Sequence, residues 1–415
     1  MSRINVENIR HPDAASDSLQ LSDTGNITAP GNLSVTGTST LTGNTVVTGS
    51  LTANGLAYPS AGPLSNRNLL YNPEMKVAQR GTTITNVGID TFMLDRWKQF
   101  ASVGTTTGRS TATQETITDL EGFRTALKLQ VTTADTDVAA TDLFAINQRL
   151  EAQDILWLDI GGTNSRSLTL SFWAKAPTGN GVFCAGLVMP GGGHYVEEVT
   201  IGTSWARHVI NIPATTTSSH ATTQTGTANG MEVVITLMAG SSRNGSTNGA
   251  WGSGTNNRAT SNQSNFYSST SNNLWVTGVQ LEVGDVATPF EHRSFGDELA
   301  RCQRYYYKAQ TTGSNSSGFF GTSYNRSTTS ALGVTFFPVE LRVAPTALEQ
   351  SGTASDYQVA HGTGGTTCTS VPAWFEADTF SARTSFTTGT SLTVGQGSTL
   401  RSASTDAFLA WSAEL

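Results

Sequence analysis

The chain has 415 residues, only 13% of them charged, and a formal net charge of −7. No basic stripe is present, so the electrostatic footprint of a nucleic-acid-binding protein is missing, as is a polybasic membrane patch. No stretch approaches the ~20 apolar residues of a membrane span, and the start lacks the apolar run of a signal peptide. From these two features we expect a protein that is made and at first kept in a cytoplasm. Forty-two glycines and long Thr, Ser and Asn tracts predict an all-β protein.

Residues 1–24 are predicted to form a short head. Apolar positions alternate in it on both sides of a His11-Pro12-Asp13 turn, which is typical of a strand-turn-strand. Two interpretations stay open: the head docks on a larger protein, or it is a frayed terminus.

Residues 25–65 are predicted to form a fibrous stem and linker, because glycine recurs every six residues from Gly25 to Gly55. Ordering six residues costs on the order of 6–12 kcal/mol of backbone entropy, whereas burying the one or two apolar side chains of each repeat returns only roughly 2–6 kcal/mol. Identical segments from other chains must then complete the ladder, which predicts a homotrimer. The alternative is a flexible Gly/Thr/Ser linker. The apolar residues expected to support oligomerisation in the stem are Val35, Leu41, Val47 and Leu51.

Residues 66–293 are predicted to form a β-sandwich of jelly-roll type. Apolar, β-branched runs at 168–174, 231–237 and 274–281 indicate strands, and Gly/Pro/Asn turns separate them. Trp173 and Trp275 lie within these runs and are expected to be core residues.

A family resemblance covers most of the chain. Residues 68–74 (Asn-Leu-Leu-Tyr-Asn-Pro-Glu), 78–81 and 95–97 resemble the start of a carbohydrate-binding-like jelly-roll module that is common in bacteriophage tail fibre proteins. Residues 279–284, followed by 287–291, look like the closing strand of those modules, and residues 298–306 look like the join that follows.

The head before a Gly/Thr repeat is also similar to the virion-anchoring end of phage fibres. The resemblance implies a structural fibre in the tail of a virion, held through residues 1–24 by a phage tail protein. It further implies attachment to a host-cell receptor, most simply a surface glycan, without catalysis.

Two regions of the sandwich are candidates for sugar binding. Asp95-Arg96-Trp97 combines a carboxylate, a guanidinium and an indole, although the same set can be a core plug with an internal ion pair. The polar tract from Gly240 to Asn273 contains aromatic residues that can stack on sugars, and its Trp251 can instead fasten the tract to the sandwich. The candidate residues of this tract are Trp251, Arg258, Phe266 and Tyr267.

Residues 294–415 are predicted to form a short helix followed by a small, distal, receptor-binding β-sandwich. Ser294 can cap a helix that runs to about Gln303 and is followed by a strand. The side chains of Leu299, Cys302 and Tyr306 then recur at helical spacing, either as a seam between subunits or as a face that packs on the sandwich.

The clearest strands of the C-terminal part are predicted at residues 331–342 and 407–411. Residues 337–342, followed by Ala344-Pro345-Thr346, are similar to a segment of small C-terminal domains of phage fibres. The loops at residues 314–325 and 361–370 are the expected receptor contacts, and the aromatic candidates there are Tyr324, Tyr357 and Trp374.

Neither a metal site nor a cofactor is predicted. The histidines show no metal-ligand spacing, and Cys184, Cys302 and Cys368 are odd in number and far apart. Some phage tail proteins are depolymerases with paired carboxylates, so Glu197-Glu198, Asp154 with Asp159, and Glu376 with Asp378 are the pairs to test. Three functions remain: a glycan-binding fibre, a purely structural tail adaptor or decoration protein, and a depolymerase.

Overall fold

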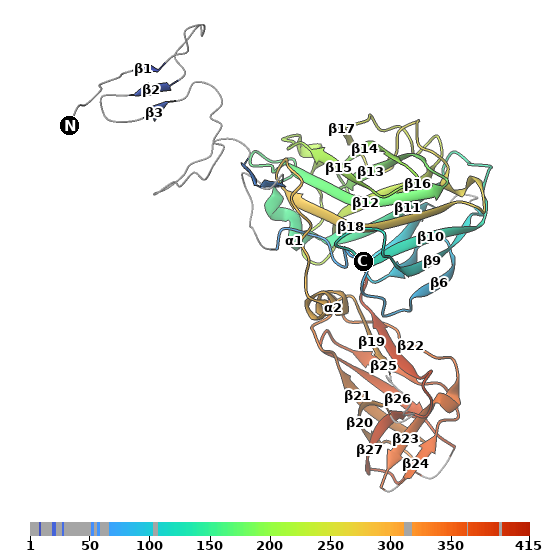
Figure 1. The fold of residues 1–415 in the computed structure, drawn as a ribbon. Helices are drawn as coiled ribbons and strands as arrows, with labels where there is room; N and C mark the ends of the chain where they lie inside the picture. The colour runs from blue at the N-terminus through green and yellow to red at the C-terminus, as the bar shows by residue number, and fades with distance from the viewer. Residues whose placement is uncertain are drawn as a thin grey trace. The chain divides into compact units, whose positions relative to one another are not determined.

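The computed structural model describes residues 66–102, 107–310, 318–362, 364–389 and 392–415, together with the backbone of five short strands before residue 66. The chain divides into two compact units, residues 1–49 and 50–415, and each is described by itself (Figure 1). Among the described residues, no helix combines the length and the apolar character needed to cross a membrane.

The first unit contains a small antiparallel sheet in the order β1-β2-β3. Its strands are β1 (Asn8–Ile9), β2 (Leu19–Leu21) and β3 (Ile27–Thr28). Strands β1 and β2 stand on either side of the predicted turn, as a strand-turn-strand requires. Most of the glycine register, including Val35, Leu41 and Val47, lies outside the described residues.

The second unit begins with a hairpin of β4 (Leu51–Ala53) and β5 (Leu56–Tyr58). Asn54-Gly55 stands between the two strands, and Asn-Gly is the dipeptide that tight hairpin turns favour. The predicted oligomerisation residue Leu51 lies in β4, and its side chain is outside the described part of the chain.

Two antiparallel sheets form a β-sandwich, as the predicted fold class requires, and their strands lie between Thr83 and Val283 (Figure 1). The six-stranded sheet has the order β15-β12-β18-β10-β9-β6, and the seven-stranded sheet has the order β17-β14-β13-β16-β11-β8-β7. The chain passes repeatedly between the two sheets, as in jelly rolls. The strands are β6 (Thr83–Val87), β7 (Thr91–Leu94), β8 (Trp97–Ser102), β9 (Arg109–Thr116), β10 (Thr125–Thr133), β11 (Leu143–Glu151), β12 (Leu168–Thr178), β13 (Gly181–Val188), β14 (Gly193–Ile201), β15 (Ala206–Ile212), β16 (Asn229–Ala239), β17 (Ala250–Ser253) and β18 (Asn273–Val283).

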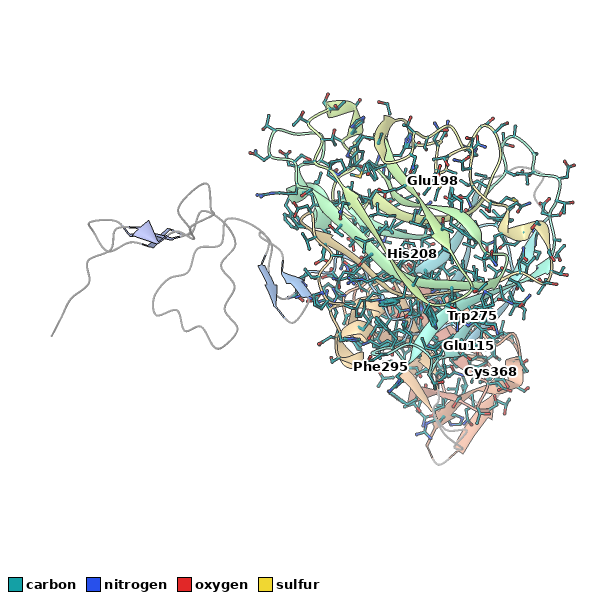
Figure 2. All side chains as sticks on the ribbon, turned by 45° about the horizontal axis from the view of Figure 1, so that its top comes forward. Glu115, Glu198, His208, Trp275, Phe295 and Cys368 are labelled. Atoms are coloured by element: carbon teal, nitrogen blue, oxygen red, sulfur yellow. The ribbon has the colours of Figure 1, made fainter. Side chains whose placement is uncertain are left out.

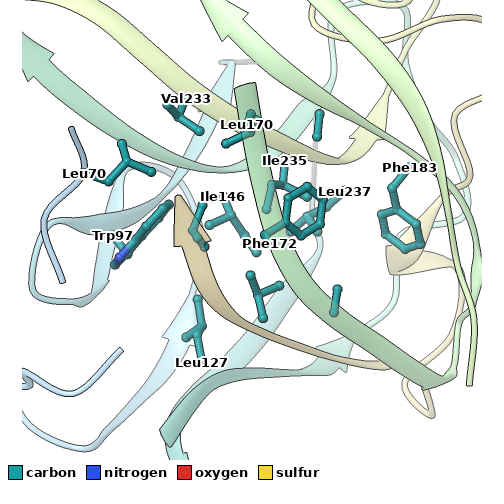
Figure 3. Packing of buried hydrophobic residues seen from close by; sticks show 14 of the residues in the cluster. Leu70, Trp97, Leu127, Ile146, Leu170, Phe172, Phe183, Val233, Ile235 and Leu237 are labelled. Atoms are coloured by element: carbon teal, nitrogen blue, oxygen red, sulfur yellow. The ribbon is translucent and has the colours of Figure 1, made fainter. Parts of the chain in front are cut away.

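The core lies between the two sheets and is built from the inward-facing residues of both (Figure 3). Leu170 and Phe172 come from the six-stranded sheet, and Ile146, Val233 and Ile235 come from the seven-stranded one. The three predicted strand runs fall within β12, β16 and β18, so the apolar pattern located them correctly.

Asp95, Arg96 and Trp97 are all buried, so the motif is a core plug and not a sugar site. The Trp97 indole donates to the Asn72 carbonyl at 2.9 Å. Arg96 is ion-paired with Glu414 of the C-terminal segment and not with its neighbour Asp95, whose carboxylate accepts from Gln79 instead. The internal ion pair was predicted, but its partner is 318 residues away.

Helix α2 (Phe295–Gln303) and strand β19 (Tyr306–Gln310) lie where the sequence predicts them. The Ser294 hydroxyl accepts a hydrogen bond from the Asp297 N–H at 3.1 Å, so Ser294 is the predicted helix cap. The other helical segments are α1 (Ala152–Ile155), η1 (Leu156–Leu158), η2 (Ser218–His220), η3 (Phe266–Ser268) and η4 (Ala354–Asp356).

The C-terminal domain is also nearly all β. A three-stranded sheet of order β19-β28-β22 and a seven-stranded sheet of order β24-β23-β27-β20-β21-β26-β25 contribute to one apolar core. The strands after β19 are β20 (Phe319–Asn325), β21 (Ser330–Phe336), β22 (Glu349–Gln350), β23 (Tyr357–His361), β24 (Gly364–Thr367), β25 (Ala373–Ala377), β26 (Ser381–Thr387), β27 (Gly397–Ser402) and β28 (Phe408–Ser412).

The strand predicted at residues 331–342 is shorter than expected, because β21 ends at Phe336. Pro338 follows two residues later and has no N–H to donate to a neighbouring strand. The prediction at residues 407–411 is confirmed by β28.

Candidate functional site

A polar groove of about 780 Å³ lies on the C-terminal domain, over one half of its seven-stranded sheet. Strands β20, β23, β24 and β27 form it, and Cys368 marks the domain that carries it in Figure 2. It therefore brings together parts of the two regions predicted as receptor contacts, residues 314–325 and 361–370. The lining residues are Thr322, Ser323, Gln358, Ala360, His361, Gly362, Gly364, Gly365, Gly397, Ser398, Thr399 and Arg401.

Strand register explains why polar side chains meet in this groove. Thr322 on β20 lies opposite Thr399 on β27, and Arg401 on β27 lies opposite Gln358 on β23. Directly opposed residues of an antiparallel pair share one face, and the intervening Leu400 points into the core. One face of these strands therefore carries buried side chains, Leu400 among them, and the other presents hydroxyl, amide and guanidinium groups.

Glycines leave the groove open. Gly364 and Gly397 have no atom within 4 Å of the position that a β-carbon would take. At Gly365 a β-carbon would lie 2.4 Å from the Gln358 amide oxygen, so a side chain there would displace Gln358. Glycine at such strand positions allows another molecule to approach the backbone closely.

Several polar groups of the groove have no hydrogen bond with any residue that the structure describes. The Gln358 amide donates to the Ser402 carbonyl at 2.9 Å, which holds its side chain against the sheet. Among the described residues, by contrast, the Arg401 guanidinium and the hydroxyls of Thr322 and Thr399 have no hydrogen-bond partner. These groups can bond a ligand without breaking a contact of the fold.

Tyr324, predicted as a receptor contact, lies beside this groove. It follows Thr322 by two residues on β20, so both side chains project from the same face of the sheet. Its side chain is 46% exposed, and the residue opposite it is Gly397, which leaves the ring uncovered on that side. The ring can therefore stack on a sugar bound next to the polar groups.

The sequence did not predict Gln358, Thr399 or Arg401 as site residues. The alternation from Ser398 to Arg401 indicates a strand with one polar face. It does not indicate which other strands lie beside that face, and this depends on pairing across the whole domain.

Trp374 is exposed, at 41%, but lies outside the groove. It belongs to the edge strand β25, next to Ala373. Successive strand pairings lead from Tyr324 on β20 across β21 and β26 to Ala373, so the two residues are three strands apart. At about 4.8 Å per strand this separation is roughly 14 Å. Trp374 and Tyr324 are therefore accessible to ligands but do not form one compact site.

Four predicted site residues are buried, and the prediction that they contact a ligand was wrong. Phe266 and Tyr267 form η3 and insert into the main core, where the Tyr267 hydroxyl donates to Gln99 at 2.6 Å. Tyr357 lies in the core of the C-terminal domain, and its hydroxyl donates to a backbone carbonyl. Arg258 is buried in an ion pair with Glu232. The hydroxyls of Tyr267 and Tyr357 and the charge of Arg258 have partners inside the fold, which allows these side chains to be buried.

Glu232 is the centre of a charged network on the seven-stranded sheet of the sandwich. Its carboxylate lies 2.8 Å from Arg258 and 3.0 Å from Arg149. Burial alone would raise the pKa of Glu232, but Arg258 and Arg149 outweigh burial and lower it. A carboxyl group with a lowered pKa stabilises the fold above the ordinary value of about 4.5, and this contribution is lost as the pH falls.

We expect Glu232→Gln to lower the free energy of unfolding by about 3 kcal/mol at pH 7, because two guanidinium groups lose their counter-charge. The difference from the unchanged protein should shrink below pH 4.5, where protonation removes the same contribution from the unchanged protein. Urea unfolding at pH 7 and near pH 3.5 measures both effects. Asp285→Asn, at an exposed position, is the control and should change little. An equal difference at the two pH values would contradict the expectation.

Trp251 fastens the polar tract to the sandwich. Its indole donates to the Pro213 carbonyl at 2.8 Å and stacks on His220 with ring centroids 5.4 Å apart. A second ring contact, 5.7 Å between centroids, joins it to Tyr195. Of the two predicted roles, the contacts support fastening.

Trp173 and Trp275 are not part of the main core, contrary to expectation. They lie half-buried on the outer face of the six-stranded sheet, where Figure 2 labels Trp275. Lys128 and Lys175 stand opposite Trp275 on the two neighbouring strands, with their ammonium groups 4.9 and 5.3 Å from its ring centre. The protein's own cations thus occupy this ring, which makes it a weaker platform for a sugar than Tyr324.

The prediction of a helical seam between subunits was wrong for two of its three residues. Cys302 and Tyr306 are buried within the chain, and only Leu299 is half-buried. Burial raises the pKa of the Cys302 thiol well above its usual value. The Tyr306 hydroxyl donates to Glu349 at 2.9 Å, and the Arg80 guanidinium lies over its ring. Tyr306 thus contacts Arg80 of the sandwich as well as Glu349 of the C-terminal domain, and packing on the sandwich was the alternative interpretation.

The carboxylate pairs have partners within the fold. Glu198 accepts from the Thr260 hydroxyl at 2.5 Å, and Glu197 accepts from the Tyr195 hydroxyl at 3.2 Å. Asp378 accepts from two backbone N–H groups of a turn. Within the described part of the chain, no group of three His, Cys, Asp or Glu side chains is placed to hold a metal ion.

No protein-family model matches the chain, and no curated protein matches it either. Among solved structures, the chain is similar to an arabinose-bound α-L-arabinofuranosidase, with 10% identity over 52% of this chain and 26% of that enzyme, and a TM-score of 0.28. It is similar to a family 11 carbohydrate-binding module of a Clostridium thermocellum cellulase, with 11% identity over 51% of this chain and 98% of that module, and a TM-score of 0.25. A putative sugar-binding protein from Bacteroides thetaiotaomicron matches over 52% of this chain and 100% of its own, with 11% identity and a TM-score of 0.28. These similarities are too distant to indicate a ligand.

Proposed function

We propose that the chain is a non-catalytic tail fibre subunit of a bacteriophage, and that it attaches the virion to its host by binding a cell-surface glycan in the groove of the C-terminal domain. The observation that carries the proposal is the groove itself, with hydroxyls and a guanidinium that no described residue pairs with, beside the exposed ring of Tyr324. A glycan offers many hydroxyls and a few apolar ring faces, and this lining matches both.

The sequence resemblance to phage fibre proteins supports the biological setting. It implies that residues 1–24 attach to a tail protein and that the C-terminal domain is distal, where receptor contacts belong. A purely structural adaptor would need no open polar groove, and a depolymerase would need a free pair of carboxylates near its ligand. No Asp or Glu lines the groove in the described part of the chain.

The groove can be blocked without disturbing the fold. Gly397 lines it, lies opposite Tyr324 and has room for a side chain, so Gly397→Phe should fill the space that a ligand needs. Gly202 in the sandwich also has no atom within 4 Å of a β-carbon, which makes Gly202→Phe a matched control.

We expect Gly397→Phe to weaken binding to host cells by at least about tenfold, while Gly202→Phe binds as the unchanged protein does. Binding of the labelled full-length chain to a panel of bacterial strains, with polysaccharide length followed in parallel, is the measurement. Unchanged binding of Gly397→Phe would exclude the groove as the receptor site. Release of oligosaccharides would favour the depolymerase, and failure to bind any strain or isolated glycan would favour the adaptor.

A further inference from the structure

The groove is basic, although the protein is acidic. Arg401 is the one permanently charged side chain among the described residues that line it, and no carboxylate lines it. The sequence gives no charged residue at positions 311–317, 363 or 390–391, so these parts of the domain add no counter-charge. A single uncompensated positive charge in a chain of net charge −7 marks this face as different from the rest.

Arg401 also differs from other arginines of the same domain. Arg383 is ion-paired with Glu376, and Arg342 donates to the backbone carbonyls of Thr227 and Ala413. The half-buried Arg401 has neither an ion pair nor a hydrogen bond with any described residue. An arginine that is held on a strand and left unpaired retains all its donors for a ligand.

The neighbours of Arg401 suit a charged sugar. Thr399 projects from the same face two residues earlier and supplies a free hydroxyl. Phe319, 60% exposed, lies opposite Arg401 on β20, and Tyr324 lies five residues further along that strand. Neither ring is among the residues that line the groove, but both are exposed on β20, on either side of Thr322. Exposed rings near such donors suit a short oligosaccharide.

We propose that the groove recognises an acidic glycan, whose carboxylate or sulfate group is bound by the Arg401 guanidinium and the Thr399 hydroxyl. This inference rests on the proposed function and specifies its ligand. The planar guanidinium fork matches the two oxygens of a carboxylate and also those of a sulfate ester, so both sources share one chemistry.

The experiment is binding of the full-length chain to an array of neutral, carboxylated and sulfated oligosaccharides, in which galacturonate tetramers and their neutral methyl esters form a matched pair. We expect binding to acidic glycans, weakened by at least about tenfold in Arg401→Gln and less in Arg401→Lys, which retains the charge but not the fork. Arg383→Gln, outside the groove, is the control and should bind as the unchanged protein does. Raising the salt concentration to about 1 M should weaken the binding, since the Debye length then falls to about 3 Å.

The outcomes separate this inference from the proposed function. In one outcome neutral and acidic glycans bind equally, Arg401→Gln leaves this binding intact, and Gly397→Phe abolishes it. This outcome would overturn the acidic ligand and keep the groove as a glycan site. No binding to any glycan would overturn both. Preference for the galacturonate tetramer over its methyl ester would identify the carboxylate as the recognised group, and preference for sulfated glycans would identify the sulfate.

Discussion

Glu414→Ala is expected to lower the free energy of unfolding by about 3–5 kcal/mol, the usual effect of removing one partner of a buried ion pair. The Glu414 carboxylate is ion-paired with Arg96, whose side chain is 1% exposed, and lies 3.3 Å from Arg80. Burial alone would lower the pKa of Arg96, and Glu414 reverses this shift, so that the pKa is raised. Without Glu414 the Arg96 guanidinium remains charged in the interior, over the ring of Tyr305.

Chemical denaturation of the full-length chain measures this effect. Glu376→Ala is the matched control, because its ion pair with Arg383 is exposed and should contribute only about 0–1 kcal/mol. Replacing Arg96 and Glu414 together by Met and Leu should recover part of the loss, since the fully buried Arg96 charge is then removed, while Arg80 still loses its ion pair. A loss below about 1 kcal/mol for Glu414→Ala would show that water reaches Arg96.

The ion pair of Arg96 with Glu414 connects the β-sandwich to the C-terminal segment, and a second set of buried contacts does the same. Arg304, at the end of helix α2, forms two hydrogen bonds with the buried Glu151 of β11, at 2.9 and 3.0 Å, and the Tyr305 hydroxyl donates to the same carboxylate. Burying a carboxylate requires such complete pairing. The chain between Ser50 and Leu415 forms one compact unit, and these contacts explain why its two β-regions do not separate.

Strands and the helix could be predicted because their signals are local. The apolar runs of β12, β16 and β18 and the Ser294 cap of α2 each depend on residues a few positions apart. Pairing partners are not local. Arg96 was expected to pair within its own motif and pairs with Glu414 instead, and Tyr267 was expected on a loop surface and reaches Gln99 in the core.

Composition misled the prediction of the site for a similar reason. An aromatic residue in a polar tract is exposed only if the tract does not fold back, and Trp251, Phe266 and Tyr267 belong to a tract that does. Tyr324 remains exposed because β20 places it on the outer face opposite a glycine. Arg401 was not predicted because one arginine in a strand is common, and only the tertiary structure shows that no described residue pairs with it.

The second large effect is expected on the oligomeric state, when the residues before Asn66 are removed. We expect the full-length chain to form trimers, and a chain beginning at Asn66 to be monomeric, because the glycine repeat cannot offset its own backbone entropy without identical neighbours. Light scattering measures the two masses, and denaturation of both proteins checks that the sandwich is equally stable. A monomeric full-length chain would contradict the fibrous stem and favour a flexible linker.

Loss of the trimer should strongly weaken attachment to cells, while the affinity of a single groove for its ligand should hardly change. Three linked grooves bind a glycan-covered surface with an avidity that exceeds single-site affinity by about 10²–10⁴-fold. Removing residues 1–65 should therefore reduce binding to cells by that factor, while affinity for one soluble acidic oligosaccharide stays unchanged. Equal losses in both assays would show instead that the truncation damages the groove. If the truncated chain binds as strongly as the full-length chain in both assays, the fibre attaches through a single subunit.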